Sequence, residues 1–297
     1  MIIKRADILA HIQQNVERLS DAGESAYPYI PLHQKPSPSI TALKEMMLLV
    51  RNVLFPGFFG EAGEARHSSM SYYTGVHLEQ IYDLLQEQTY NGLCFDAEAS
   101  GEAKARSYAI ALDFMDRLPH VKHLLSTDVK AILDGDPAAK SASEVIFCYP
   151  AMIAFLHQRV AHELFKLQVP LIPRIITEMA HSYTGIDIHP GAQIGEYFSI
   201  DHGTGVVIGQ TTIIGNHVRL YQGVTLGAKN FTLDEEGLPM DLPRHPIIED
   251  HVTIYSNASI LGRITIGRGS IIGGNIWLTH SVPPFSKITQ SSAIEAK

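Results

Sequence analysis

The sequence predicts an α+β protein in which an N-terminal all-helical domain, residues 1–183, is followed by a parallel β-helix of hexapeptide repeats, residues 184–297. Three observations lead to this prediction. Apolar residues up to about residue 183 recur every three to four positions, as a buried helix face requires. After Gly185 they recur every six positions, with glycine, asparagine or aspartate between them. A stretch without hexads, residues 228–244, interrupts the second pattern.

The helical half is expected to contain six to eight helices. The first should bury one face near the N-terminus, formed by Ile8, Leu9, Ile12, Val16 and Leu19. Prolines and an Asn-Gly pair mark the boundaries of the later helices, because proline cannot donate a backbone hydrogen bond and suits only a first helical turn. These helices are expected at residues 40–54 before Pro56, 75–90 before Asn91-Gly92, 102–117 before Pro119, and 150–168 beginning at Pro150.

The repeats of the second half are expected to form one short strand and one turn each, which is typical of a parallel β-helix. A β-sandwich is the alternative, but alternating strands have a period of two and would not keep a six-residue register. We call the residues that recur at six-residue intervals the ladder. Twelve of its thirteen positions are aliphatic. They are Ile188, Ile194, Ile200, Val206, Thr212, Val218 and Val224, then Ile248, Ile254, Ile260, Ile266, Ile272 and Leu278.

Composition excludes several classes of protein. The net charge of -8 and the lack of a basic stripe argue against nucleic-acid binding. Charges break up the apolar residues of the N-terminus, and the longest apolar patch, from Met46 to Val50, is too short to cross a membrane. Cys94 and Cys148 provide neither a disulfide framework nor a CxxC pair. We therefore expect a cytoplasmic protein.

Short motifs inside and before the repeats are similar to those of the serine O-acetyltransferases, a family of the hexapeptide acyltransferase superfamily. The similarity extends over roughly residues 130–285. It rests on Asp136-Pro137-Ala138, on Arg159, His162 and Leu164 in the helix that follows, on Asp187-Ile188-His189-Pro190, on Asp201-His202-Gly203-Thr204-Gly205, on Gln222-Gly223-Val224-Thr225-Leu226-Gly227 and on Arg244-His245-Pro246.

This resemblance implies a left-handed β-helix that assembles as a homotrimer or a dimer of trimers. It implies transfer of acetyl from acetyl-CoA to the hydroxyl of L-serine, the first committed step toward cysteine, and feedback inhibition by cysteine at the serine site. Acetyl-CoA is then a co-substrate, and neither a permanently bound cofactor nor a metal is expected.

The resemblance also assigns the site residues. They are the catalytic base His202, its carboxylate partner Asp187, the serine-binding acids Asp136 and Asp201, and the carboxylate-binding residues Arg244 and His245. Histidine suits the task because its pKa near 6.5 allows it to take the hydroxyl proton, and a carboxylate on the far ring nitrogen would stabilise the imidazolium.

The spacing of these residues suggests how the acids divide their roles. Asp187 and His202 are fifteen residues apart, nearly one coil of three hexads, so they could touch. Neighbours on an extended strand point to opposite faces, so Asp201 is left for the substrate ammonium. A guanidinium can hold a carboxylate with two hydrogen bonds, which suits Arg244. Small residues that would let a pantetheine arm lie along the coils are Gly227, Ala228, Ser256 and Gly274.

Structural explanations of the same residues stay open. Asp136 could be a helix N-cap before a first-turn proline, Asp187 and His202 could be turn residues, and Arg244 and His245 could only anchor the loop. The remaining histidines of the second half are read as surface or structural residues, and Trp277 as packing at the end of the ladder. Those histidines are His189, His217, His251 and His280.

Three other functions are considered. A related acetyltransferase could act on another hydroxylated acceptor, a sugar or a xenobiotic, because Gly273-Gly274-Asn275-Ile276-Trp277 is more like that branch of the superfamily. A trimeric metal hydratase would need three histidines around Zn²⁺, for which His202, His245 and His251 are available. A non-enzymatic scaffold would need no site. The family's isoleucine-ended tail is missing after Lys297, so we do not expect a cysteine synthase complex.

Overall fold

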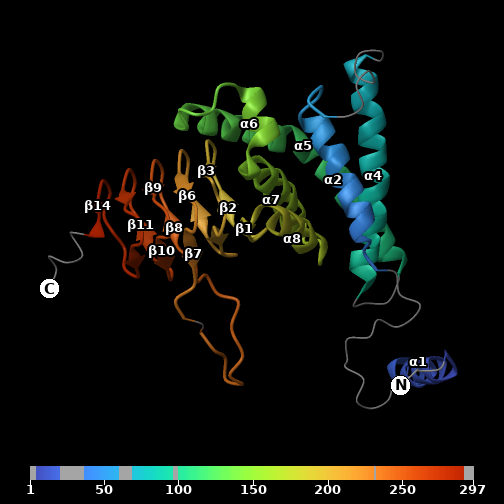
Figure 1. Cartoon of the computed structure of the whole chain (residues 1–297). Coiled ribbons are helices and arrows are strands. Elements are labelled where there is room, and N and C mark those ends of the chain that lie inside the picture. Colours follow the sequence, from blue (N-terminus) through green and yellow to red (C-terminus); the bar gives the residue numbers. More distant parts are fainter. Residues whose placement is uncertain (1–4, 21–36, 60–68, 96–99, 231, 291–297) are drawn as a thin grey trace. The chain divides into compact units, whose positions relative to one another are not determined.

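The computed structural model contains seven helices followed by a solenoid of short parallel strands among the residues that it describes (Figure 1). This confirms the predicted fold class, and the solenoid matches a left-handed β-helix of about five turns. The change from helix to strand falls at Gly185, which ends the last helix in a left-handed conformation with φ 71°. The described residues are 5–20, 37–59, 69–95, 100–230 and 232–290.

The helices differ from their predicted bounds most at α4 and α5. They are α1 Arg5–Ser20, α2 Ile40–Leu54, α4 Met70–Phe95, α5 Gly101–Gly135, α6 Ala142–Cys148, α7 Pro150–Lys166 and α8 Ile172–Thr184. The predicted bounds of α2 are confirmed. Helix α7 begins at Pro150 as predicted but ends two residues early, at Lys166. The predicted stops at Asn91-Gly92 and before Pro119 are wrong, because α4 and α5 continue through them.

Packing explains why α5 passes through a proline. Pro119 lies on the exposed face of the helix, where water can replace the hydrogen bond that proline cannot donate. The opposite face stays buried on both sides of it, through Phe114, Leu118, Val121 and Leu125. Burial of this continuous apolar face outweighs the local preference for a helix end.

Helix α1 belongs to a separate unit, residues 1–36, and is described by itself. The predicted helix is present, but its apolar face is not buried as expected. The exposed fractions are 48% for Ile8, 57% for Leu9, 54% for Ile12, 49% for Val16 and 86% for Leu19.

The solenoid is a prism with three parallel sheets. Sheet A contains β1 Asp187–Ile188, β4 Val207–Ile208, β7 Thr225–Gly227, β10 Ser259–Leu261 and β13 Trp277–Leu278. Sheet B contains β2 Gln193–Ile194, β5 Ile213–Ile214, β8 Ile247–Ile248 and β11 Thr265–Ile266. Sheet C contains β3 Ser199–Asp201, β6 Arg219–Tyr221, β9 Thr253–Ile254, β12 Ile271–Ile272 and β14 Lys287–Ile288. We call the corners where the chain turns between sheets the A/B, B/C and C/A edges.

The register of the first coil corrects the predicted ladder. Ile188 pairs with Ile208, 20 positions later, whereas Ile208 pairs with Leu226, 18 positions later. Two extra residues therefore lie between Ile200 and Val206, in the C/A turn that contains His202. The ladder positions up to Ile200 and those from Val206 to Val224 belong to two different inward columns.

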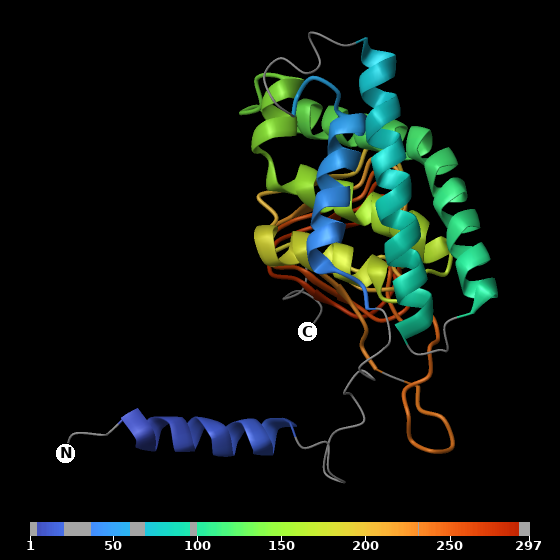
Figure 2. The same ribbon diagram turned by 90° about the vertical axis from the view of Figure 1, so that its right-hand side faces the viewer.

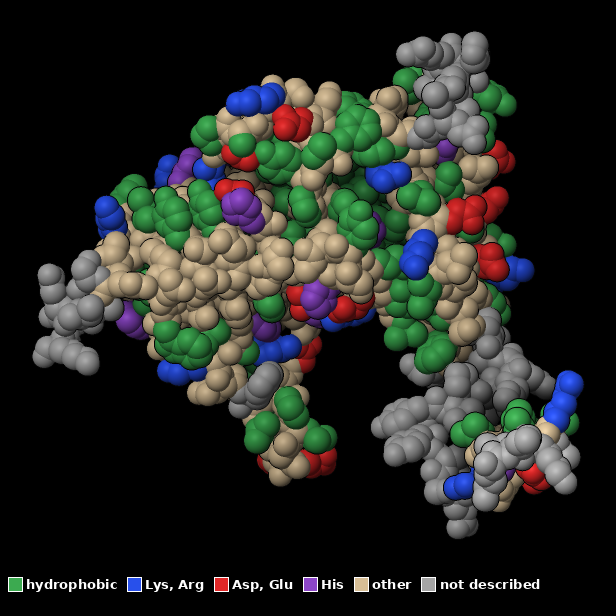
Figure 3. All heavy atoms as spheres, in the orientation of Figure 1, with side chains coloured by type: hydrophobic (Ala, Val, Ile, Leu, Met, Phe, Trp, Pro, Cys, Tyr) green, Lys and Arg blue, Asp and Glu red, His purple; other side chains and the backbone are tan. Residues whose placement is uncertain are grey.

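The second interruption, residues 228–244, lies at the A/B edge between β7 and β8 and carries no repeat, as predicted. It forms a small hairpin in which Leu233 and Pro239 make an antiparallel bridge. Figures 1 and 2 show this hairpin projecting from the solenoid. Its acidic tip is exposed, as are Leu233, Leu238, Met240 and Leu242 along it. Figure 3 shows acidic and hydrophobic side chains on the surface of the projecting segment.

Helices α5 and α7 cap the open end of the solenoid with polar side chains. The guanidinium of Arg159 donates to the carbonyls of Ile194 and Gly195, the second at 2.7 Å, and pairs with Asp128 at 3.0 Å. Asp128 in turn accepts from the backbone N–H of Phe198 at 3.2 Å. Both side chains are almost fully buried. The pair thus satisfies backbone groups of the first coil that have no further strand to bond.

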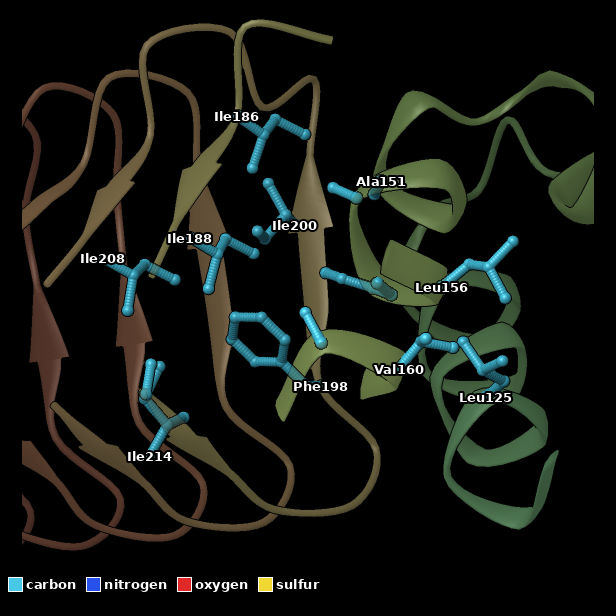
Figure 4. Close-up of a cluster of buried hydrophobic side chains, with 14 of the residues drawn as sticks. Leu125, Ala151, Leu156, Val160, Ile186, Ile188, Phe198, Ile200, Ile208 and Ile214 are labelled. Carbon is cyan, nitrogen blue, oxygen red and sulfur yellow. The ribbon is translucent and has the colours of Figure 1, made fainter. Parts of the chain in front are cut away.

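Apolar packing completes this junction. Phe198 and Ile200 from the first coil meet Ala151 and Val160 of α7 and Leu125 of α5 in one buried cluster (Figure 4). Because the helices and the first coil share this core, the end of α5 is held against β3. None of the described helices is both long and apolar enough to cross a membrane.

Candidate active site

The C/A edge carries His202 on the turn that contains the two extra residues. Three residues of this turn have positive φ: 57° at His202, 93° at Gly203 and 79° at Gly205. The left-handed conformation of His202 ends the alternation of inward and outward side chains along β3. It leaves the side chain of His202 73% exposed. Nε2 of His202 lies 3.8 Å from Oδ1 of Asp201. The predicted divergence of the Asp201 and His202 side chains is therefore wrong, because neighbouring side chains point to opposite faces only along an extended strand.

Asp136 faces this turn from the end of α5. It is the C-cap residue of α5, so the alternative reading as an N-cap is wrong. Its Oδ1 accepts from the backbone N–H of Ala138 at 2.8 Å, and its Oδ2 accepts from the hydroxyl of Tyr149 at 2.6 Å. These bonds, first that from Tyr149 and then that from Ala138, hold the pKa of Asp136 below its usual value, and nearby His202 lowers it further.

A narrow recess between α5 and β3 joins these groups. Asp136, Tyr149, Asp201 and Arg219 line it. The hydrogen bond to the carboxylate of Asp136 raises the pKa of Tyr149 to about 12, and burial and the negative charge of Asp201 contribute to the same shift. Sequence reasoning missed Tyr149, whose one signal was its position directly before Pro150. The structure thus brings Asp136, Asp201 and His202 to one edge.

Asp187 is the first residue of β1, which pairs with β4, the strand that follows the His202 turn. Among the described residues no hydrogen bond or ion pair joins it to His202, so the expected contact is not formed in the single chain. One of its oxygens instead lies within 4.8 Å of ligand atoms of Glu178 and His181. A separation of fifteen residues would bring Asp187 and His202 together in coils of three hexads, but the first coil is two residues longer than that. Asp187 remains bonded to the same turn through its backbone N–H, which donates to the carbonyl of Val206 at 2.9 Å.

The A/B edge carries Arg244 and His245. Their backbone N–H groups both donate to Oγ1 of Thr211, at 2.9 and 3.1 Å. The ring of His245 packs against Gly209, where an added Cβ would lie 2.0 Å from Cδ2 of the ring, so a side chain at Gly209 is excluded. Arg263 donates to the carbonyl of His245 at 2.9 Å. The hairpin is thus anchored firmly where it rejoins the solenoid.

His245 is held neutral. His245 is only 7% exposed. Burial, and to a smaller extent the positive charges of Arg244 and Arg263, lower the pKa of its imidazole to about 4. Nδ1 accepts from the backbone N–H of Thr211 at 3.1 Å, which leaves the ring proton on Nε2. His189 lies near the same cluster, and burial, Arg174 and His245 lower its pKa to about 4 as well.

Arg244 is held by the hairpin and by the neighbouring turn. Nη1 lies 3.1 Å from Oδ1 of Asp241, and Nη2 donates to Oε1 of Gln210 at 2.8 Å. Asp241 is 74% exposed and Arg244 only 22%. Neither Gln210 nor Asp241 was singled out from the sequence, because neither belongs to a recognisable motif.

The predicted site is therefore divided between two edges of one chain. Sheet A separates the acids and His202 from Arg244 and His245. The small residues divide in the same way. Ser256 and Gly274 stack at the C/A edge, where an added Cβ at Gly274 would lie 3.2 Å from the Ser256 carbonyl, whereas Gly227 and Ala228 begin the hairpin at the A/B edge. Trp277 points outward from sheet A and is 72% exposed, so its expected packing role is wrong.

A metal site finds little support. Within the described part of the chain, Glu178, His181 and Asp187 form the group that could hold an ion. Arg174 already forms an ion pair with Glu178, so the guanidinium neutralises this carboxylate and a metal ion is not needed to do so. The three histidines of the hydratase alternative, His202, His245 and His251, lie at three different edges of the prism.

Comparisons with known proteins agree on one family. The chain is 47% identical over 286 residues to the plasmid serine acetyltransferase of Synechococcus elongatus, covering 93% of this chain and 89% of that protein. The crystal structure of serine acetyltransferase 1 from Entamoeba histolytica with L-cysteine is 32% identical, with a TM-score of 0.73 over 95% of this chain and 97% of that one.

A more distant structure is serine acetyltransferase from Neisseria gonorrhoeae in complex with serine. It is 26% identical, with a TM-score of 0.54 over 82% of this chain and 93% of that one. No protein-family model matches the chain.

Proposed function

Because the chain belongs to the serine acetyltransferase family, we propose that it transfers the acetyl group of acetyl-CoA to the hydroxyl of L-serine, giving O-acetyl-L-serine for cysteine biosynthesis. The enzyme class, acyltransferase, follows from the family. The observation that carries the proposal is the meeting of Asp136, Asp201 and His202 at the C/A edge, on a turn that leaves the repeat to expose the histidine.

His202 acts as the general base. The serine hydroxyl is a weak nucleophile at neutral pH, so a base must take its proton while the oxygen attacks the thioester carbon. The tetrahedral intermediate then expels the CoA thiolate, which takes up a proton and leaves as the thiol. The nucleophile belongs to the substrate, so this direct transfer needs no acyl-enzyme and neither cysteine takes part.

The carboxylates at the C/A edge bind the serine ammonium. Asp136 and Asp201 line the recess beside His202, together with Arg219, which donates to the carbonyl of Gly135 at 2.9 Å. An ammonium there meets two carboxylates and one guanidinium. Asp187 assists from the neighbouring strand, where its backbone is bonded to the end of the His202 turn. We propose that it orients the imidazole once the exposed ring turns toward the solenoid.

Arg244 and His245 bind the serine carboxylate, Arg244 through its guanidinium and His245 through the proton on Nε2. In one chain they lie across sheet A from His202, so a complete site needs the A/B edge of a second copy. A homotrimer, alone or as a dimer of trimers, would build three such sites between neighbouring copies. Sheet A would then face the threefold axis, because both of its edges take part in sites.

The coenzyme would lie along the same interface. Ser256 and Gly274 continue the C/A edge beyond the His202 turn, and their small side chains leave room for a pantetheine arm. Gly227 and Ala228 would line its other side from the neighbouring copy. Acetyl-CoA is thus a co-substrate that enters and leaves in each cycle.

L-cysteine is proposed to compete with L-serine at this site. The Entamoeba relative was crystallised with L-cysteine and the Neisseria relative with serine, which supports recognition of both amino acids by this fold. Cysteine carries the same ammonium and carboxylate as serine, so the groups at the two edges can hold it equally well. Competitive inhibition by L-cysteine against L-serine in steady-state kinetics is the expected result, and purely uncompetitive inhibition would argue against a shared site.

The test of the function is thiol release from acetyl-CoA with a panel of acceptors. L-serine should give the largest kcat/KM, well above homoserine, sugars and chloramphenicol. A sugar or chloramphenicol as the best acceptor would instead identify the chain as an acetyltransferase for another hydroxylated compound. No acceptor-dependent thiol release at all would refute the proposed activity.

A further inference from the structure

Tyr149 connects the start of α7 to the carboxylate at the end of α5. Its hydroxyl donates to Oδ2 of Asp136 at 2.6 Å, the shortest of the contacts that hold this carboxylate. The phenol also lines the recess with Asp201. We propose that Tyr149 is a positioning residue that fixes Asp136 as the acceptor for the substrate ammonium. This inference rests on the proposed function and adds a residue to its amino-acid site.

The carboxylate of Asp136 is oriented by two donors of different origin. The backbone N–H of Ala138 holds Oδ1 at 2.8 Å from the turn that follows α5, and the Tyr149 hydroxyl holds Oδ2 from α7. One donor alone would leave the carboxylate free to rotate about χ2. With both donors in place, each oxygen keeps a free lone pair, because a carboxylate offers about four acceptor positions in all. These lone pairs remain available for the ammonium.

The phenol itself is held rigidly. Tyr149 is both the C-cap of α6 and the residue before the first turn of α7. Its backbone N–H donates to the carbonyl of Val145 at 3.2 Å, and its carbonyl accepts from Met152 at 3.0 Å. Pro150, which follows, further restricts the backbone. A side chain mounted on two helix ends in this way loses little additional entropy when it holds Asp136.

Protonation favours the same arrangement. The pKa of Tyr149 is raised to about 12, so the phenol keeps its proton and donates throughout the working range of pH. The pKa of Asp136 is lowered by the same bond, so the carboxylate stays charged and accepts. Tyr149 thus remains the donor and Asp136 the acceptor while the neighbouring base, His202, gains and loses a proton during turnover.

The alternative is that Tyr149 only stabilises the segment between α5 and α7. A structural role would change the melting temperature and would affect both substrates alike. A positioning role predicts a selective effect on serine, because Asp136 is proposed to contact only the amino acid. The two roles therefore separate in a comparison of KM values.

The experiment replaces Tyr149 by phenylalanine, which removes only the hydroxyl. KM for L-serine should rise about tenfold, the loss expected for a hydrogen bond to a charged group, while kcat changes by no more than about threefold. KM for acetyl-CoA should stay unchanged. The matched control is Tyr108→Phe on α5, 40% exposed and outside the proposed site, which should leave all three constants as in the wild type. Circular dichroism melts set a temperature at which every variant is folded.

A double-mutant cycle with Asp136→Asn tests the pathway of the effect. If Tyr149 acts through Asp136, the double variant should be no worse for serine than Asp136→Asn alone. Tyr149→Phe kinetics equal to those of Tyr108→Phe, or fully additive losses in the double variant, would overturn the inference. Either result leaves wild-type turnover of serine intact, whereas failure of the proposed function would appear as a wild type without serine-dependent thiol release.

Discussion

The C/A and A/B edges both interrupt the repeat, but they do so by opposite means. At the C/A edge two extra residues loosen one turn and leave His202 73% exposed. At the A/B edge a long hairpin leaves the solenoid and returns, and its last residues place the ring of His245 against Gly209. The same residue type is thus presented to solvent at one edge and buried at the other.

This contrast suggests a division of labour. An exposed imidazole beside Asp201 can approach a substrate and exchange a proton. A buried imidazole, with one nitrogen accepting from Thr211 and a pKa lowered to about 4, can only donate a hydrogen bond from the other nitrogen. We therefore expect chemistry at the C/A edge and recognition of the substrate carboxylate at the A/B edge.

The strongest test of this division is His202→Asn. Loss of a general base should lower kcat by about 10² to 10⁴, with little change in KM for either substrate. The matched control is His217→Asn at the B/C edge, also an exposed histidine on a left-handed turn residue, which should keep wild-type kcat. Equal rates of thiol release for the two variants would remove His202 from the chemistry.

The second test asks whether the two edges of a site come from different copies. His202→Asn and Arg244→Ala should each be nearly inactive alone. If the two are co-expressed with different affinity tags and purified as mixed oligomers, about one site in four should combine two intact edges and recover activity. Recovery should be absent if each chain builds its own complete site, and the tagged mixtures can be checked by native mass spectrometry.

A smaller effect is expected from Asp241→Asn in the hairpin. The ion pair with Arg244 is 3.1 Å long but 74% exposed on the Asp241 side, so it contributes at most about 1 kcal/mol. Loss of this competing carboxylate should free the guanidinium and lower KM for serine by up to about fivefold. Asp234→Asn at the exposed tip of the same hairpin is the control. A higher KM in Asp241→Asn would show instead that Asp241 holds Arg244 in place.

The last test concerns the dependence of stability on pH and leaves activity aside. His245 has a pKa of about 4 in the folded chain, below the ordinary value near 6.5, so between these values the unfolded chain binds a proton that the folded chain does not. Stability should therefore fall as pH decreases from about 6.5 to about 4, by at most about 3 kcal/mol, because each pKa unit of difference corresponds to about 1.4 kcal/mol.

The matched comparison is His245→Asn, in which this part of the acid sensitivity should be missing while His189 still contributes its own. Urea titrations at several pH values would measure the difference between the two proteins. An identical pH dependence would mean that His245 is protonated as easily in the folded chain as in the unfolded one.

The sequence predicted the fold with few errors because burial imposes a period. Every predicted ladder position is buried or half-buried in the solenoid, and the predicted interruption lies between β7 and β8. The two extra residues before Val206 were invisible for a physical reason. Each hexad points two aliphatic side chains inward, two positions apart, so a two-residue insertion moves the ladder from one inward column to the other without an apparent break.

The sequence by itself thus determined the fold class, the position of the helix-to-strand change and the group of residues from which the site is built, because periodicity and motif are local properties. Only the tertiary structure decided which of those residues meet. The left-handed turn at His202 brought Asp201 near the imidazole and left Asp187 apart, and two helix ends placed Tyr149 on Asp136. Such contacts depend on backbone conformation and on packing between distant segments, which no spacing along the chain records.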